Sequence, residues 1–182
     1  MKNILIILVI VIGAGLTFYF FTNSGKENLI NDQKDNVATT QISDARKTFQ
    51  VEVDVPEGWE AVEGSVLDIQ YLKNTASFMI KTESFSTTDL SEVANQAISI
   101  FQGAFDNVSL VEEVSDVKIA GYDAKEFTFT AQVSSLSMKY RYIYTIVDGQ
   151  VYAITFADME STFDDLNDDF QSIIDSIRFV EE

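Results

Sequence analysis

The chain has 182 residues, with no cysteine and no histidine, and its formal net charge is −17 at pH 7. The two missing residue types exclude disulfides, thiolate metal sites, a cysteine nucleophile and the commonest general base and metal ligand. From residue 46 onward, 25 acidic and 9 basic side chains give a net charge of −16. A surface of that sign repels phosphate backbones, so nucleic-acid binding is not expected.

The N-terminal segment predicts a membrane anchor. Residues 4–21 read ILIILVIVIGAGLTFYFF, an uncharged run of 18 residues, and as a helix they would span about 27 Å, close to the hydrocarbon thickness of a bilayer. Lys2 precedes the run, whereas Lys26 beyond it is followed at once by Glu27. This charge asymmetry favours a cytoplasmic N-terminus. We therefore predict a transmembrane signal anchor over residues 1–21 and a single-pass cell membrane protein with an extracytoplasmic C-terminal domain.

A cleaved signal peptide is the alternative interpretation of the same segment. Small residues at Thr22 and Ser24 would suit cleavage before Gly25, but the aromatic residues 18–21 are typical of a membrane interface and favour the anchor. The absence of cysteine excludes a lipoprotein. Residues 22–45 are polar and poor in aromatics, which predicts a flexible linker with a root-mean-square span of about 25–30 Å.

Residues 46–182 predict one globular domain that begins with strands. Apolar residues alternate with polar ones over 49–55, and Pro56 to Trp59 predicts a turn that ends this run. Strands follow over 66–72 and 76–82. Asp89 with Glu92 forms a capping box for a helix whose apolar stripe extends to Phe105, and Asn107 is expected to stop it.

The second half of the domain predicts more strands and a closing helix. Strands are expected over 108–113, 117–120, 125–132, 137–147 and 150–157, the last two joined in a hairpin at Asp148-Gly149. Both faces of that hairpin are apolar, which indicates layers on both sides of the sheet. A helix over 163–177 is capped by Thr162 with Asp165 or by Ser161 with Asp164. We predict an α+β fold, an antiparallel β-sheet with helices packed on both faces, preceded by one transmembrane helix.

Several short segments of the domain follow one another in a characteristic order and spacing: Phe49-Gln50-Val51, Pro56-Glu57-Gly58-Trp59, Gly121-Tyr122-Asp123-Ala124-Lys125-Glu126-Phe127, Val151-Tyr152-Ala153-Ile154-Thr155-Phe156, Phe163, Phe170 and Ile174-Asp175-Ser176-Ile177-Arg178-Phe179. In these segments, residues 48–179 resemble the PsbP-like superfamily, which includes the extrinsic PsbP protein of photosystem II and the Ran-binding factor Mog. The resemblance implies an α/β/α sandwich, a bacterial membrane-anchored member, and a binding protein more often than an enzyme. It implies no shared active site, and the metal-linked residues of the photosystem protein have no matching motif in this chain.

A group of six acidic residues surrounds the start of the last predicted helix. Hard cations such as calcium prefer several oxygen ligands, so the group is a weak calcium candidate. The calcium-loop pattern with its central glycine is absent, and acids favour helix N-termini and solvated helix faces in any case. We favour the second interpretation and predict no metal site. The six residues are Asp158, Glu160, Asp164, Asp165, Asp168 and Asp169.

We interpret the other candidate binding residues as parts of the folded structure rather than as functional sites. Lys139 and Arg141 alternate with tyrosines, a pattern that can bind single-stranded nucleic acid, but in so acidic a domain they are more simply local neutralisers beside core tyrosines. Trp59 could line a pocket, although a tryptophan in such a turn more often plugs the end of a core. Scattered glycines form no phosphate-binding loop. No residue is assigned as catalytic or cofactor-binding, and no cofactor is expected.

The predicted function is a membrane-tethered extracytoplasmic interaction module whose partner is an envelope or membrane protein with a basic patch. Nucleophilic catalysis would have to rest on Ser-Lys or carboxylate chemistry, and the one Ser-x-x-Lys spacing, Ser115 with Lys118, lies in a strand region. The alternative is an envelope hydrolase that uses paired carboxylates, whose separation the sequence does not give. We therefore predict a binding protein rather than an enzyme.

Overall fold

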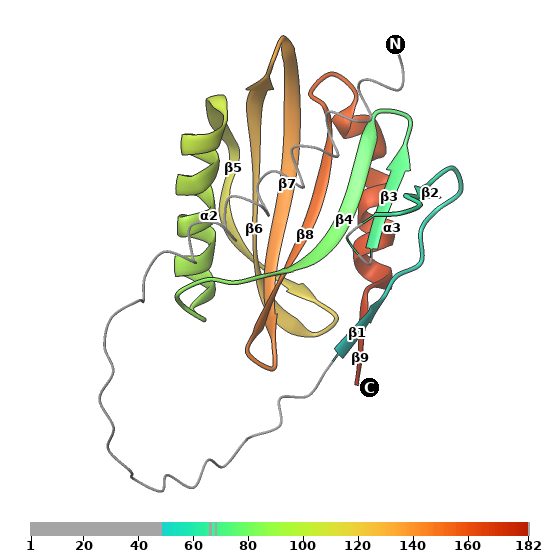
Figure 1. Ribbon diagram of the computed structural model, residues 1–182, viewed down its shortest axis with the longest axis vertical. Helices are drawn as coiled ribbons and strands as arrows, with labels where there is room; N and C mark the ends of the chain where they lie inside the picture. The colour runs from blue at the N-terminus through green and yellow to red at the C-terminus, as the bar shows by residue number, and fades with distance from the viewer. Residues whose placement is uncertain (1–48, 66, 68, 182) are drawn as a thin grey trace, which may run out of the picture. The chain divides into compact units, whose positions relative to one another are not determined.

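The computed structural model describes residues 49–181 except 66 and 68 (Figure 1). They belong to one compact unit, Lys47–Glu182. The predicted anchor over residues 1–21 and linker over 22–45 lie outside the described residues. Within the described part of the chain, no helix has the length and apolar character needed to cross a membrane.

The domain is built on a seven-stranded antiparallel sheet with strand order β2-β3-β4-β8-β7-β6-β5. A separate two-stranded ribbon joins the first described strand, β1, to the last, β9. The strands of the sheet are β2 (Glu60–Ala61), β3 (Ile69–Lys73), β4 (Ala76–Glu83), β5 (Asp106–Ile119), β6 (Tyr122–Val133), β7 (Leu136–Val147) and β8 (Gln150–Met159), and those of the ribbon are β1 (Phe49–Glu52) and β9 (Arg178–Glu181).

The two helices lie on opposite faces of the sheet. Helix α2 (Leu90–Ala104) places Phe101 4.6 Å from the ring of Tyr142, and helix α3 (Asn167–Ser176) places Phe170 4.6 Å from Phe156. Tyr142 pairs with Thr155 across β7 and β8. Because neighbouring residues of a strand point to opposite faces, Phe156 lies on the face opposite Tyr142. The predicted α+β sheet with helices on both faces is confirmed, with α2 beside β5 and β6 and α3 beside β3 and β4 (Figure 1).

Local sequence signals account for helix α2. The Asp89 side chain accepts hydrogen bonds from the backbone N–H groups of Ser91 and Glu92, as the predicted N-cap residue should. The second half of the predicted capping box differs, because the backbone N–H of Asp89 donates to the Thr87 hydroxyl rather than to Glu92. Four buried residues, Val93, Ala94, Ala97 and Phe101, form its sheet-facing stripe. The helix ends at Ala104, and Asn107 adopts a left-handed backbone conformation with φ 54° just beyond it. The predicted stop is therefore close to the observed end.

The hairpin between β7 and β8 has the predicted register. Val147 pairs with Gln150 and Ile146 with Val151. Asp148 and Gly149 both have positive φ, 48° and 77°, as a two-residue hairpin turn of the type I′ class requires. The twist of this turn matches that of the flanking strands, which explains why a short local motif sets the pairing of β7 with β8.

Four expectations differ from the structure. The segments 108–113 and 117–120 form one strand, β5, interrupted only by register shifts. The first strand ends at Glu52 and pairs with β9 rather than with a strand of the main sheet. Strands β2 and β9 were not predicted, because strands of two to four residues are too short to show a periodic pattern. The closing helix starts as a 3-10 turn, η1 (Phe163–Leu166), and Thr162 does not cap it, because its hydroxyl donates to Asp158 instead.

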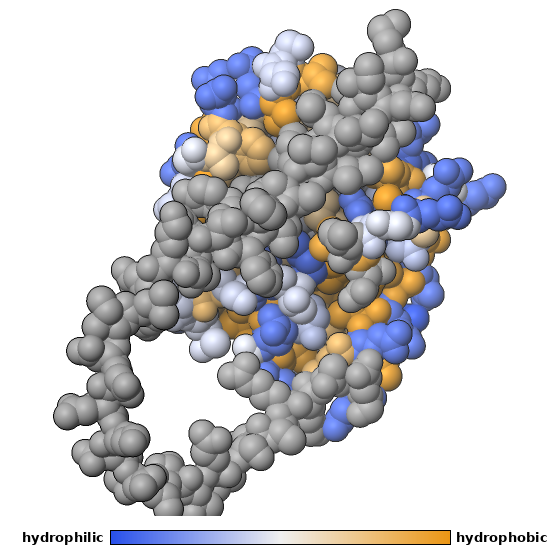
Figure 2. Space-filling view, in the orientation of Figure 1, coloured by the Kyte–Doolittle hydropathy of each residue, from blue (hydrophilic) through white to orange (hydrophobic). Residues whose placement is uncertain are grey.

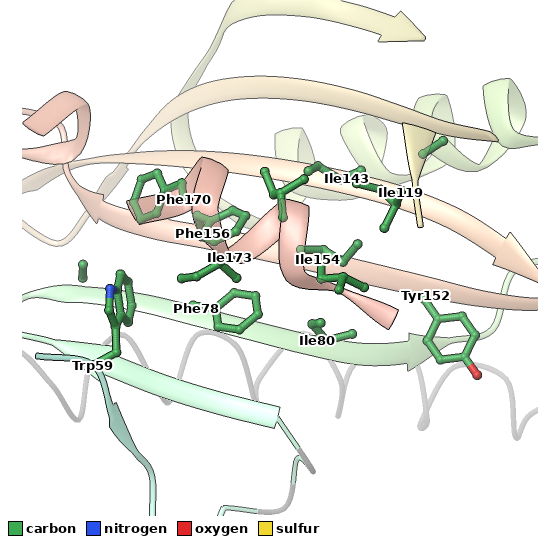
Figure 3. Packing of buried hydrophobic residues seen from close by; sticks show 14 of the residues in the cluster. Trp59, Phe78, Ile80, Ile119, Ile143, Tyr152, Ile154, Phe156, Phe170 and Ile173 are labelled. Carbon is green, nitrogen blue, oxygen red and sulfur yellow. The ribbon is translucent and has the colours of Figure 1, made fainter. Parts of the chain in front are cut away.

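The face of the sheet that carries α3 holds an extensive apolar cluster (Figure 3). Phe78 of β4 stacks on Phe156 of β8 at 5.1 Å, and Phe170 and Ile173 of α3 pack on the same rows. Trp59 lies at one end of this cluster (Figure 3). The β1–β9 ribbon adds partly buried residues, including Phe49 and Phe179. This core fixes α3, and therefore the acidic residues at its start.

Candidate functional site

A polar contact closes the end of the α3-side core. The Trp59 indole nitrogen donates a 2.8 Å hydrogen bond to Asp169 Oδ2, and Lys73 Nζ lies 2.6 Å from the same oxygen. Trp59 is 7% exposed and its ring lies 6.2 Å from that of Phe170. Trp59 therefore plugs the core, with its one polar atom bonded to helix α3. We call Trp59, Lys73 and Asp169 the polar lock.

The polar lock changes the acidity of Asp169. The hydrogen bond from Lys73 is the largest cause of the lowered pKa of this carboxyl, and the bond from Trp59 lowers it further against the opposing effect of burial. Asp169 lies 96 residues from Lys73 and 110 from Trp59 along the chain. No local sequence signal connects the three residues, which is why the sequence does not predict the lock.

The other acids of the calcium candidate are separated by their own partners. Asp158 is 2% exposed, with Oδ2 accepting from the Thr162 hydroxyl at 2.8 Å. Glu160 accepts from Ser137, and Asp164 pairs with Lys139 at 2.8 Å. Asp165 and Asp168 are exposed. Among the described residues, no three acidic side chains come together in a group that could hold a metal ion. Around the start of the last helix, the acidic side chains are instead paired with hydroxyl groups and lysine amines.

The basic and aromatic residues of β7 point to opposite faces. Lys139 lies on the α3 face, 2.8 Å from Asp164 and with Nζ 5.1 Å from the centre of the Phe163 ring. Arg141 lies on the same face and bonds Glu126 through Nε at 2.6 Å. Tyr142 and the tyrosines two residues away on either side pack under α2. The alternating sequence pattern therefore does not form one basic and aromatic surface.

Each of the seven basic side chains in the described part of the chain makes an ion pair with an acid. The described part contains 23 acidic residues against these 7, a surplus of 16 negative charges. The surface therefore offers carboxylates and no unpaired cation among the described residues. The pairs are Lys73–Asp169, Lys81–Glu83, Lys118–Asp123, Lys125–Asp116, Lys139–Asp164, Arg141–Glu126, and Arg178 with Glu52 and Asp54.

Exposed acids gather around the polar lock. Glu57 and Glu60 flank Trp59 in sequence and are exposed, as are Asp165 and Asp168 just before Asp169. Because Trp59 bonds Asp169, the two pairs of acids lie at the same end of the domain. The protruding segment around β2 is hydrophilic in the space-filling view (Figure 2). We call Glu57, Glu60, Asp165 and Asp168 the acidic end.

Comparison with known proteins identifies the fold. No family model matches the sequence, and a search of curated proteins finds no significant match. Solved structures do match. A Pseudomonas aeruginosa protein of unknown function, PA94, described as a putative regulator, is similar with a TM-score of 0.53 and 13% identity over 72% of this chain and 84% of that protein. LpqN of Mycobacterium tuberculosis, described as involved in cell envelope biogenesis, has a TM-score of 0.59 and 10% identity over 76% and 87%.

The cyanobacterial PsbP protein of Synechocystis is also among the matches. Its TM-score is 0.48, with 13% identity over 71% of this chain and 91% of that protein, a similarity too low to carry weight alone. The likeness to PA94 and LpqN shows a shared fold, in this chain an antiparallel sheet with two helices. Identities of 10–13% show the fold and transfer no activity.

Proposed function

We propose that this domain is a membrane-tethered extracytoplasmic interaction module, and that its acidic end binds a basic patch on another envelope or membrane protein. The observation that carries the proposal is the complete pairing of the seven described cations, which leaves a purely negative surplus on the surface. A partner of opposite charge would be steered to such a surface, and salt would weaken the contact.

The acidic end is suited to this role because its exposed acidic side chains lie beside the polar lock. The polar lock joins Trp59 and Lys73 of β3 to Asp169 in the first turn of α3 through two contacts shorter than 3 Å. The exposed acids that flank the lock, Glu57, Glu60, Asp165 and Asp168, are therefore carried on fixed backbone. A preorganised charged surface binds without a further cost of ordering its own backbone.

The predicted membrane anchor supports binding over catalysis of a diffusing substrate. A tethered domain is confined near the membrane, which raises its effective concentration toward other membrane-bound proteins. An enzyme for a freely diffusing small molecule gains little from that confinement. The involvement of LpqN in cell envelope biogenesis agrees with an extracytoplasmic role, although that protein shares only the fold with this chain.

A hydrolase that uses paired carboxylates is the alternative prediction. Its general acid would need a pKa raised toward neutrality. Among the described residues, the carboxyl groups whose pKa values are displaced, Asp123 and Asp169, have lowered values, in each case chiefly because of a hydrogen bond from a lysine. This direction suits an ion pair rather than a proton donor, so we place the hydrolase second.

Cross-linking of the full-length protein in bacterial membranes, followed by purification, tests the proposal. The wild-type chain should capture a specific partner protein with basic surface residues at low salt and lose it at high salt. The double variant Asp165→Asn, Asp168→Asn should lose the partner. The matched control Asp106→Asn, Glu113→Gln changes the net charge equally at exposed sites on β5 and should retain it.

Two results would overturn the proposal. Equal capture by both double variants would show that the acidic end is not the contact surface. Turnover of an envelope polysaccharide by the purified chain, without any captured protein, would favour the hydrolase.

A further inference from the structure

Strand β5 forms one edge of the main sheet. It pairs with β6 and with no other strand that the structure describes. The outward backbone N–H and C=O groups of an edge strand are a template on which a further strand can pair. The opposite edge offers less of this template, because β2 has only two residues. An added strand would therefore find the longer template on β5.

The two halves of β5 differ in regularity. Three register shifts interrupt its pairing with β6 between Asp106 and Ser115. Bulges of this kind twist an edge and protect it against further pairing. From Ser115 to Ile119 the register continues without a shift. The second half of β5 therefore presents an undisturbed edge, and we call residues 115–119 the regular edge.

The turn after β5 determines which backbone groups of the regular edge point outward. A two-residue turn with positive φ, 50° and 88°, follows Ile119. In such a turn the residue before it bonds across to the residue after it, and along an antiparallel strand these bonds come from every second residue. The backbone groups of Asp116 and Lys118 therefore point outward. Those of residues 115, 117 and 119 point to β6.

The side chains of the regular edge belong to a patch of balanced charge. Asp116 lies 2.6 Å from Lys125 of β6, and Lys118 lies 2.7 Å from Asp123. The side chains of Asp116 and Lys118 are 87% and 68% exposed, so both are accessible from outside. These two acids and two lysines form a neutral patch on an otherwise strongly acidic domain. At this patch a second copy of the domain would meet no local surplus of like charge.

The order of the charges fits an antiparallel copy of the same edge. If a two-fold axis passes through Val117, Asp116 lies opposite Lys118 of the second copy, and Lys118 lies opposite Asp116 of the second copy. Both residues have outward backbone groups, so each of these pairs exchanges two hydrogen bonds. An axis through Asp116 or through Lys118 would set like charges opposite each other. An axis between two residues would set an outward residue opposite an inward one.

The same arrangement continues the charge pattern that the domain already has. Val117 packs against the apolar cluster on the α3 face, so its neighbours Asp116 and Lys118 project from the α2 face. Across the joined sheets, Asp123 and Lys118 would be followed by Asp116 and Lys125 of the second copy. The charges would therefore alternate in sign across four strands, and cross-strand pairs of opposite charge stabilise a sheet.

We propose that the regular edge pairs with the regular edge of a second copy, so that the two main sheets become one continuous sheet. The paired segment is only five residues long, and an interface of this size is small. We therefore expect exchange between monomer and dimer rather than a permanent dimer. The regular edge shares no residue with the acidic end, and this proposal does not depend on the function proposed for that end.

Both chains would enter such a dimer near its axis. The Tyr122 ring, just beyond β5, lies 5.5 Å from the ring of Phe179 in β9. Strand β9 pairs with β1, where the described chain begins at Phe49. The two chains would therefore enter the domains close to each other, as attachment of both copies to one membrane requires.

The absence of cysteine allows a direct test by disulfide cross-linking. Full-length Val117→Cys is expressed in bacteria and oxidised in intact cells, and the dimer is measured on non-reducing gels. The two introduced thiols would lie on facing residues with Cα atoms about 4.5 Å apart, a separation that a disulfide can bridge. In the matched control, Ser115→Cys, they would lie about 14 Å apart along the strands, although Ser115 is more exposed than Val117. Val117→Cys should give at least about 10-fold more dimer than Ser115→Cys.

Charge reversal tests the register of the pairing. In the Val117→Cys background, Lys118→Glu and Asp116→Lys should each lower the dimer yield about 10-fold, because each sets like charges opposite each other at two places. Co-expression of these two variants with different tags should restore the yield in the mixed dimer, because every acid of one copy then lies opposite a lysine of the other. This rescue also shows that both variants fold.

The proposal is overturned if Val117→Cys forms no more dimer than Ser115→Cys, or if the co-expressed variants cross-link no better than either variant alone. A disulfide product of a different mass in place of the dimer would assign the regular edge to another protein and would equally overturn it.

Discussion

The two faces of the sheet are packed differently: most of the large side chains come from the sheet on the α2 face, whereas the helix supplies more of them on the α3 face. Under α2 the bulk comes from the sheet, where rings on β6 and β7 stack nearly parallel at 10–23°, and the helix contributes one large residue, Phe101, beside small ones. Under α3 the helix contributes Phe170, Ile173 and Ile174, and the rings around Phe170 are tilted by 37–57°.

The difference shows how each helix is held in place. Helix α2 places one large ring, Phe101, over a row of stacked aromatic residues, and its other buried residues are small. Helix α3 has several large side chains fitted among tilted rings, and the polar lock fixes its first turn through Asp169. The α3 side is therefore expected to be the more sensitive to substitution, and the acidic end depends on it.

Phe170→Asp tests the α3 side and should have the largest effect. Phe170 is 0% exposed, so the new carboxylate would be buried among rings without a cation. We expect a loss of about 4–5 kcal/mol or more in the free energy of unfolding, measured by urea denaturation. Val111→Asp, at a site 51% exposed on β5, is the control and should change stability little. A Phe170→Asp variant that unfolds like the parent would show that α3 does not pack as described.

Phe101→Ala tests the α2 side. Its ring contacts Phe129 at 5.0 Å and Tyr142 at 4.6 Å, and it is 4% exposed. Truncation should cost about 3 kcal/mol, the lower end of the usual range for a buried phenylalanine, because α2 can settle onto the uniform stack and fill part of the cavity. Urea denaturation of this variant beside Phe170→Ala makes the comparison direct. A greater loss for Phe101→Ala than for Phe170→Ala would reverse the ranking of the two sides.

Asp169→Asn tests the polar lock and should have the smallest effect. The amide oxygen can still accept from Trp59, but the charge that pairs with Lys73 is lost, at a cost of about 1 kcal/mol near neutral pH. The pKa of Asp169 is lowered in the folded state. Its contribution is therefore present above the ordinary value of 3.8 and is lost as the pH falls through the lowered folded value.

Melting temperatures across this pH range measure the effect. The parent and Asp169→Asn should differ at pH 7 and converge at acidic pH. A difference that persists at a pH below the lowered folded value would mean that the asparagine disturbs the packing rather than the charge.

The sequence predicted what is decided locally. The Asp148-Gly149 turn, the Asp89 cap and the two apolar faces of the β7–β8 hairpin all depend on residues near one another in the chain. The apolar character of both faces in residues 137–157 was enough to predict layers on both sides of the sheet. The acids before Asp169 were correctly placed at the start of the last helical segment, although the first turn proved to be 3-10.

Features that depend on distant pairing were not predicted. The polar lock joins residues 96 and 110 positions apart, and the β1–β9 ribbon joins the two ends of the domain. The partners of the acidic residues followed from the same distant geometry: Asp164 meets Lys139 only because η1 returns over β7.

The β1–β9 ribbon has a mechanical consequence. Phe49 pairs with Glu181 and Glu52 with Arg178, so the chain enters and leaves the domain at the same end of a ribbon only four residue pairs long. A pulling force applied at residue 49 would break these four residue pairs one after another before it acted on the longer strands of the main sheet. The ribbon would therefore separate first, while the main sheet stayed folded.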